Sequence, residues 1–435
     1  MAHRPRLHPL AAVLCAAWLA LCTSAQAANL VDDFQAALQQ DPAYSAKQFG
    51  SQNLRIEAQV AAGAYYPRAG VSFSQGDSDS GTRRTYRITQ PIVDANRWLT
   101  RQEAAPKEAL ANHMDTQARL ELAVRVFQSV RALANAREKL ALNEANLTSL
   151  QAQASSAKLA LDVGQGTITD VLDTQLRVTQ ARAVIQRLKA DLQAAQRQYA
   201  TLTGYAPAPG AYPLQPRTLA QLNVPPLSDV VTQSLDLNPA LQAQRLNTQL
   251  SQIEARRARA QFLPSLNATL QRSRTSTGTT SSIDGVVISF DMPLQYSSLF
   301  AFQTADNKLL AQQAQERATH DQLLLELQRI HALTLAAQEE VAITREAIDA
   351  AQASVRANEQ SFEGGVRSKI DVLNALQSLL VARETHLSAQ LQLAENLLTL
   401  RLLAAQDIPS VLGTLQQQLF ASAPASASAH DKPAR

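Results

Sequence analysis

Two distant stretches of the chain carry a hydroxyl and a carboxylate at the same spacing. Thr167 precedes Asp170 by three residues, and Ser368 precedes Asp371 by three residues. In such a pair each side chain accepts a hydrogen bond from the other residue's backbone N–H, which is how many helices begin. The chemistry that this spacing predicts is helix capping, with Thr167 and Ser368 as the caps and each carboxylate placed favourably in the helix dipole.

A glycine stands six residues before each of these aspartates. Gly164 follows a long run that contains neither Gly nor Pro, and Gly365 is the second of two glycines that follow another such run. Glycine adopts the positive φ with which many helices end. Each stretch is therefore predicted to be the tip of a helical hairpin, where one helix ends and the next begins.

The rest of the chain shows no constellation of catalytic or metal-binding residues. It contains no HExxH, no GxxxxGK and no nucleophile elbow. Four histidines are spread along predicted helices without the spacing of metal ligands: His113, His320, His331 and His386. We predict no catalytic activity, no cofactor and no metal site.

The first 27 residues have the pattern of a secretory signal peptide. Arg4 and Arg6 precede an apolar stretch at 10–21, and Ala-Gln-Ala at 25–27 is a typical cleavage site. Both cysteines, Cys15 and Cys22, lie inside this segment. Lipid attachment at Cys22 is the alternative, but Leu21 stands where a lipoprotein signal has a small residue, so ordinary cleavage is favoured.

The charge balance argues against a nucleic-acid partner. Two of the 40 basic residues and none of the 37 acidic residues lie in the first 27, which leaves 38 bases and 37 acids. After residue 27 no apolar run reaches the 18 residues that predict a transmembrane helix. We therefore expect an exported chain without a helical membrane anchor.

The chain repeats itself at an offset of about 200 residues. Matched positions lie 197 apart up to residue 67, 202 apart at Pro91 and Pro293, and 201 apart at the two tips. A nearly constant offset indicates an internal duplication. Chance matching in an Ala- and Leu-rich chain is the alternative, which the matched prolines and glycines disfavour.

These offsets predict the following organisation. A first repeat covers 28–203, a linker with six prolines covers 204–226, and a second repeat covers 227–408. The last segment, 409–435, is expected to be disordered from about residue 421, where Ala and Ser dominate.

Each repeat contains one predicted β-hairpin, at 68–91 and at 265–293. Apolar and polar residues alternate there with period two, and polar links at 75–81 and 272–284 separate the strands. The hairpins are predicted to end at Pro91 and Pro293.

Two interpretations of these hairpins remain open from the pattern alone. They form a small soluble sheet packed on helices, or they are part of a membrane barrel with one face to lipid and one to a lumen. Four strands cannot close a barrel, so the second interpretation requires an oligomer. Four aromatic residues follow the strands, where an interfacial belt or a core would use them: Trp98, Tyr296, Phe300 and Phe302.

Very long helices are predicted between the hairpins and the tips. Residues 107–163 and 294–363 contain no Gly or Pro, and as helices they would extend roughly 85 and 105 Å. Apolar or small residues step by four and three along the second helix, which predicts close packing against another helix: Leu323, Leu327, Ile330, Thr334, Ala337, Val341, Thr344 and Ile348. Returning helices are predicted up to Gly204 and up to Pro409.

In this order of elements the chain resembles the TolC family of outer-membrane efflux and secretion channels. The resemblance extends over nearly all of the chain after the signal peptide. The motifs that carry it are Val163-Gly164 with Ile168-Thr169-Asp170-Val171, Gly365 with Asp371-Val372-Leu373, Tyr66-Pro67, Leu263-Pro264, Gln90-Pro91-Ile92 with Asp94 and Trp98, and Leu202-Thr203-Gly204.

The resemblance implies a mainly α fold with a small membrane β-barrel portion. Three chains would form a homotrimer with a twelve-helix tunnel and a twelve-stranded barrel, each chain giving four strands. Such a protein is an exit duct in the outer membrane of a Gram-negative cell and extends through the periplasm. The implied partners are outer-membrane lipid, a periplasmic adaptor and an inner-membrane ABC or proton-driven transporter. A soluble periplasmic coiled-coil adaptor or scaffold is the alternative, which two tips and two strand pairs disfavour.

The resemblance also implies that the tips close the periplasmic end of the tunnel. Positions that match the family's gate and constriction are Thr169, Asp170, Phe362, Arg367, Asp371 and Asn374, and Asp173 is a further acidic candidate on the first tip. Here Phe362 stands where the family often has Tyr, and Asn374 where the family can have a second acidic ring. An Asp170–Arg367 link and a ring of Asp371 carboxylates are the remaining expectations.

Adaptor docking is implied for the turns of the tips. The family often has Val-Gly-Leu there, whereas this chain has Val163-Gly164-Gln165 and Glu363-Gly364-Gly365. The sequence does not identify the adaptor or the cargo.

Overall fold

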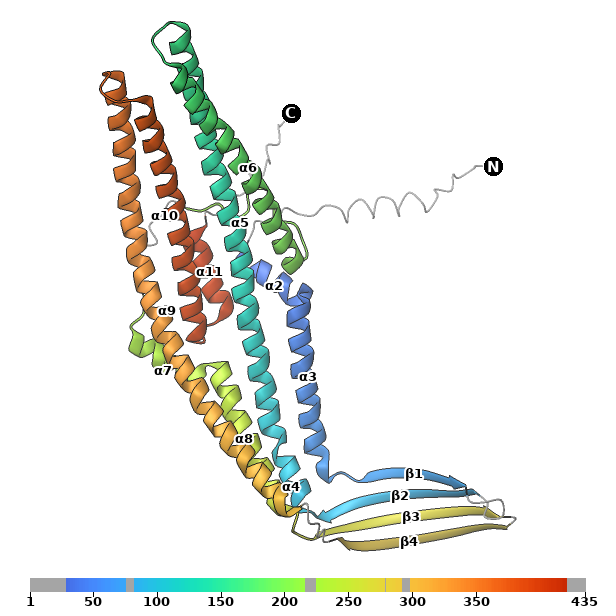
Figure 1. Ribbon diagram of the computed structural model, residues 1–435. Coiled ribbons are helices and arrows are strands. Elements are labelled where there is room, and N and C mark those ends of the chain that lie inside the picture. Colours follow the sequence, from blue (N-terminus) through green and yellow to red (C-terminus); the bar gives the residue numbers. More distant parts are fainter. Residues whose placement is uncertain (1–28, 76–81, 216–223, 278, 292–297, 421–435) are drawn as a thin grey trace, which may run out of the picture.

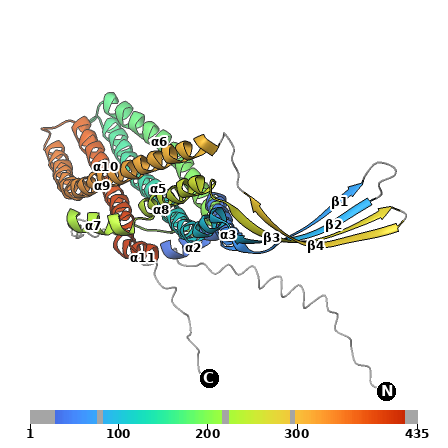
Figure 2. The same ribbon diagram turned by 90° about the horizontal axis from the view of Figure 1, so that it is seen from below.

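The computed structural model shows an elongated molecule with different structures at its two ends. Long helices lie side by side and end in two tips, and a four-stranded sheet projects sideways from the opposite end (Figures 1 and 2). The structure describes residues 29–75, 82–215, 224–277, 279–291 and 298–420. The predicted signal peptide, Tyr296 and the tail from residue 421 lie outside the described residues.

Both halves have two helices, two strands, a long helix and a returning helix in that order, and the first half also has a 3-10 turn and a short helix among the described elements. The first half consists of α2 (Leu30–Gln40), α3 (Pro42–Ala62), the 3-10 turn η1 (Gly63–Tyr65), β1 (Arg68–Gln75), β2 (Thr82–Val93), α4 (Ala95–Gln102), α5 (Ala104–Asp162) and α6 (Ile168–Thr203). The second half consists of α7 (Leu227–Leu237), α8 (Pro239–Ala260), β3 (Ser265–Thr277), β4 (Thr279–Asp291), α9 (Ser298–Glu363) and α10 (Lys369–Leu403), and a last helix, α11 (Ile408–Leu419), follows.

Matching X-Pro pairs begin the second helix of each half. The side chain of Asp41 accepts a hydrogen bond from Tyr44 N–H and caps α3, whose first residue is a proline. Asn238 caps α8 in the same way, through the N–H groups of Ala240 and Leu241. A proline in the first turn costs little, because its missing N–H would have no partner within the helix.

The sheet is antiparallel, with the order β1-β2-β3-β4, so the two hairpins pair with each other through β2 and β3. On one face, hydroxyls meet across this seam. Thr85 and Ser273 are 3.1 Å apart through their Oγ atoms, and Thr89 and Thr269 are 3.2 Å apart.

On the other face of the sheet, the part nearer the helical body is apolar and exposed, and charged side chains lie farther along the same face: Arg84, Arg272, Arg274 and Asp284. Ala69, Ile88, Leu270 and Val286 lie opposite one another across the four strands. The exposed fraction is 70% for Val286 and 68% for Ile288. The predicted alternation is therefore present, and none of the helices in the described ranges covers its apolar side (Figure 1).

Three predicted boundaries were wrong. Pro91 does not end its strand, because β2 continues to Val93 with a register shift after the proline. The segment 272–284, predicted as a turn-rich link, is mostly strand, since polar side chains fit a paired strand when the backbone ladder is complete. Pro409 does not end the returning helix: α10 ends at Leu403, and Pro409 lies in the first turn of α11.

Two helical hairpins form the body. The helices α5 and α6 make one, and α9 and α10 make the other. The predicted stripe on α9 is buried at every position except Thr344, which is half-buried. Among the residues that the structure describes, none of the helices combines the length and the hydropathy that a transmembrane helix needs.

The main core lies at mid-length, where α2 and α11 pack on the long helices. Leu122, Val126 and Phe127 of α5 are fully buried there. Tyr205 and Tyr212 donate hydrogen bonds to the Asp33 carboxylate. Burial raises the pKa of Asp33, and the hydrogen bonds from the tyrosines oppose that rise. This cluster holds the segment after α6 against α2.

Candidate functional site: the two helical tips

Both tips end their first helix with the same backbone motif. In the first, Gly164 has φ +75°, its N–H donates to Leu161 O, and Gln165 N–H donates to Ala160 O. In the second, Gly365 has φ +74°, its N–H donates to Phe362 O, and Val366 N–H donates to Ser361 O. These are Schellman motifs, in which a left-handed residue lets the chain turn and satisfies carbonyls at the helix end.

A capping box then begins each returning helix. Asp170 N–H donates to Thr167 Oγ1 over 3.2 Å, and Thr167 N–H donates to Asp170 Oδ2 over 3.3 Å. The corresponding distances for Ser368 and Asp371 are 3.3 and 3.0 Å. Hydrogen bonds from Ser368 lower the pKa of the Asp371 carboxyl, and the nearby Arg367 charge lowers it further.

The predicted link between Asp170 and Arg367 is not formed within the chain. Arg367 is exposed, and within the part of the chain that the structure describes its side chain forms no ion pair. The cation near Asp170 is Lys369, whose Nζ also lies 4.9 Å from the centre of the Phe362 ring. Burial lowers the pKa of Lys369, and the charges of Glu359 and Asp170 act against this shift.

Asn374 has a partner that the sequence analysis missed. Arg177 Nη2 of α6 donates to Asn374 Oδ1 of α10 over 2.6 Å. No local pattern in the sequence points to this contact, because its two residues are 197 apart. Asp173 is half-buried, and no side-chain partner is recorded for it among the described residues.

Apolar side chains are exposed at both tips of the single chain. The exposed fraction is 60% for Val163, 62% for Leu172 and 82% for Val366. Thr169 and Phe362 are also exposed. Apolar side chains gathered at the end of a helical body are typical of a surface that another protein covers.

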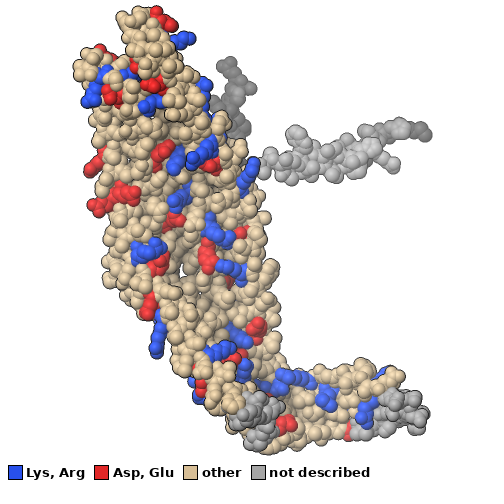
Figure 3. Space-filling view, viewed as in Figure 1, with Lys and Arg blue, Asp and Glu red and all other residues tan. Residues whose placement is uncertain are grey.

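Acidic and basic side chains are mixed along the helical body, including the tip end (Figure 3). Within the described ranges, no three His, Cys, Asp or Glu side chains lie together as a metal ion would require. In the described part of the helical body, polar side chains cap helices and form hydrogen bonds between helices.

The chain thus has a sheet with exposed apolar side chains at one end and capped helical tips at the other. The model of the outer membrane efflux protein family matches residues 34–205 and 230–406. The chain belongs to this family, and the resemblance to TolC channels is confirmed. It is an outer-membrane protein of the exit-duct class, which overturns the alternative of a soluble adaptor.

Individual relatives agree with this assignment. The chain is 27% identical to the proteases secretion protein PrtF of Dickeya chrysanthemi, over 91% of this chain and 90% of that protein. It is 24% identical to the alkaline protease secretion protein AprF of Pseudomonas aeruginosa, over 83% and 81%. The fold matches the CmeC outer membrane channel of Campylobacter jejuni with a TM-score of 0.73 at 13% identity, over 90% of this chain and 89% of that one.

Proposed function

We propose that three copies of this chain form one exit duct, in which the sheets close into a barrel and the helical hairpins form a tunnel. The observation that carries this proposal is the four-stranded sheet with hydroxyl side chains on one face and exposed apolar side chains on the part of the other face nearer the helices. Four strands leave two unpaired edges, and a sheet in lipid needs every edge paired. Three copies of four strands would give twelve, within the size range of membrane barrels.

The duct would be passive and have no catalytic activity of its own. Energy would come from an inner-membrane ABC or proton-driven transporter, joined to the duct by a periplasmic adaptor. Because PrtF and AprF are named for the secretion of proteases, we favour an exported protein as cargo and a type I system as the setting.

The tips would form the gate at the periplasmic end. Three Asp371 side chains, each half-buried in the single chain, would surround the constriction and favour cations there. Since Arg367 and Asp170 do not meet within one chain, their link would have to form between neighbouring chains. Thr169, Asp173, Phe362 and Asn374 complete the proposed gate.

Adaptor docking would use the turns and the apolar side chains beside them. The turn residues are Val163, Gly164, Gln165, Gly364 and Gly365. Val163, Leu172 and Val366 offer exposed apolar surface next to these turns, which a helical partner would cover.

Two measurements test the duct. Outer membranes of cells that express the chain should contain a trimer resistant to heat in detergent, and the purified trimer should conduct ions in planar bilayers. A monomer in the soluble fraction would refute the proposal.

For the gate, Asp170→Ala combined with Arg367→Ala should raise single-channel conductance, and an unchanged conductance would remove this pair from the gate.

A further inference from the structure

Side-chain hydrogen bonds join the two hairpins at three levels along α10. Farthest from the tips, Gln128 Nε2 donates to Glu395 Oε1 over 2.9 Å, and Arg131 pairs with the same carboxylate. At the middle level, Asn143 Nδ2 donates to Glu384 Oε1 over 2.7 Å. The Arg177–Asn374 bond is the third level, and it lies nearest the tips among those in the described residues.

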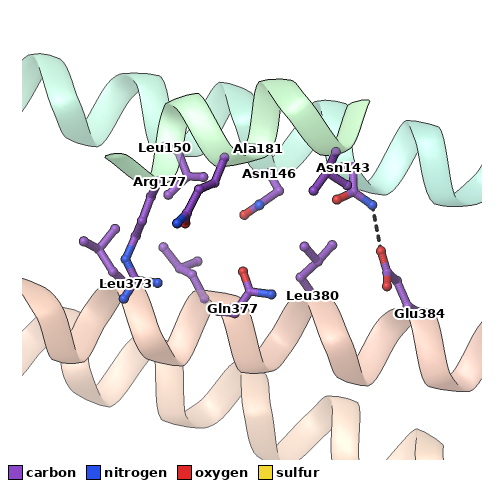
Figure 4. Close-up of a pocket in the computed structure, with 12 residues that line it drawn as sticks. Asn143, Asn146, Leu150, Arg177, Ala181, Leu373, Gln377, Leu380 and Glu384 are labelled. Atoms are coloured by element: carbon purple, nitrogen blue, oxygen red, sulfur yellow. Dashed lines mark hydrogen bonds between the residues drawn. The ribbon is translucent and has the colours of Figure 1, made fainter. Parts of the chain in front are cut away.

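The space between the second and third levels is open. A cavity of about 440 Å³ lies there, and Arg177, Asn143 and Glu384 are among its lining residues. Figure 4 shows Arg177 reaching from the first hairpin towards the second at one end of this cavity, while Asn143 and Glu384 meet at the other end. Side chains do not fill the cavity, so little packing on that side would replace the Arg177 bond if it broke.

A small apolar cluster lies beside the bond. Leu150 of α5, Val178 of α6 and Leu373 of α10 are buried together. This cluster holds the hairpins by non-directional contact, whereas the bond from Arg177 fixes their register. Arg177 is only half-buried, so water can solvate both partners when the hairpins part. A bond of this kind can break and re-form without leaving a buried charge unpaired.

We propose that Arg177 is a positioning residue of the gate: by binding Asn374 Oδ1 it holds α6 against α10 directly behind the tips and keeps the tips closed. Opening of the duct breaks this bond and leaves the two levels below it intact. Asn374 stands at the position where the family can have an acid. Its role is then to bind Arg177 and hold the two hairpins together, and it does not contribute to a ring of carboxylates. This inference rests on the proposed function, because it assigns a residue to the gate of the same duct.

The experiment uses the full-length trimer in planar bilayers. We expect Arg177→Ala and Asn374→Ala each to raise the ratio of open to closed channels on the order of tenfold, the effect of losing one bond from a charged donor. The double variant should exceed neither single variant, because both remove the same bond. Arg177→Lys should restore most of the closure, and Asn374→Asp should close the channel more firmly through a charge-assisted bond.

Arg182→Ala is the matched control, since Arg182 lies on the same helix, is exposed, and has no partner recorded among the described residues. It should behave as the wild type. A purely structural role would lower the heat resistance of the trimer in Arg177→Ala and leave gating unchanged, and that result would overturn the inference. So would additive effects in the double variant. If the wild-type protein itself forms no channels, the proposed duct fails, which is a distinguishable outcome.

Discussion

At the scale of single residues, the hydroxyl–carboxylate pairs act first on the helices that they begin. Asp371 is bound by the side chain and the backbone of Ser368. These bonds favour the charged carboxylate, so its pKa in the folded chain is lower than the ordinary value of 3.8. The stabilisation that they give is present above pH 3.8 and is lost as the pH falls through the lowered pKa.

We predict that Ser368→Ala raises the pKa of Asp371 towards 3.8 and costs about 1 kcal/mol of local helix stability. Carboxyl NMR titration should show the first effect, and faster amide exchange at 369–372 should show the second. Thr385→Ala is the control, because Thr385 is exposed within α10 and donates only to the carbonyl four residues earlier. An unchanged Asp371 titration in Ser368→Ala would mean that Arg367 dominates the shift.

The cation close to Asp170 within the chain is Lys369 and not the predicted Arg367. The sequence identified Arg367 by resemblance, but in the folded chain Lys369 is the cation near Asp170 and Phe362. A cation over an aromatic ring is attracted by the ring's quadrupole. Phe362 lacks the hydroxyl of a tyrosine, and its ring instead contacts the Lys369 ammonium group.

At the scale of elements, the tips depend on one glycine in each turn. Gly365 has φ +74°, and an added side chain would be strained there whatever the space around it. Its neighbour Gly364 has an ordinary φ, and an added Cβ would approach Gln360 O only to 3.6 Å. The pair Gly364-Gly365 therefore contains one residue that must be glycine and one that need not be.

We predict that Gly365→Ala destabilises the second tip by roughly 1–2 kcal/mol, while Gly364→Ala is neutral or slightly stabilising. Amide exchange across 361–368 in the two variants should separate them. Equal protection in both variants would show that the turn does not rely on the left-handed residue.

At the scale of the whole molecule, the feature that bears on the outer-membrane location is the exposed apolar part of the sheet. Ile288 and Val286 are exposed in the single chain, although they belong to the most apolar part of β4. In a lipid-facing barrel this face would be covered by acyl chains, and the face with Thr85 and Thr269 would line water.

We predict that Ile288→Arg sharply lowers the amount of trimer in outer membranes, because a charge on the lipid face costs about 2–4 kcal/mol at the bilayer midplane. Ser72→Arg, on the opposite face, should assemble normally, since the Ser72 row also contains Thr85. Heat-resistant trimer measured in isolated outer membranes is the readout. Normal assembly of Ile288→Arg would exclude lipid contact at this position.

The sequence by itself determined the elements and their order. Local rules suffice for these: the alternation of the strands, the spacing of the α9 stripe and the cap at Thr167 depend only on neighbours along the chain. Boundaries such as Pro91 and the polar segment 272–284 failed because strand pairing decides how far each strand extends: β2 pairs with β3 about 180 residues away, and β4 pairs along β3 within its hairpin.

Only the tertiary structure decided which side chains meet across the hairpins. Arg177 and Asn374 are 197 residues apart and belong to different repeats. Their contact depends on the register of two hairpins that pack through α5 and α10. A shift by one helical turn would pair each residue with a different partner, and no local pattern encodes that register. The sequence therefore predicted the caps and turns of the tips, whereas the hydrogen bond between Arg177 and Asn374 follows from the packing of the two hairpins.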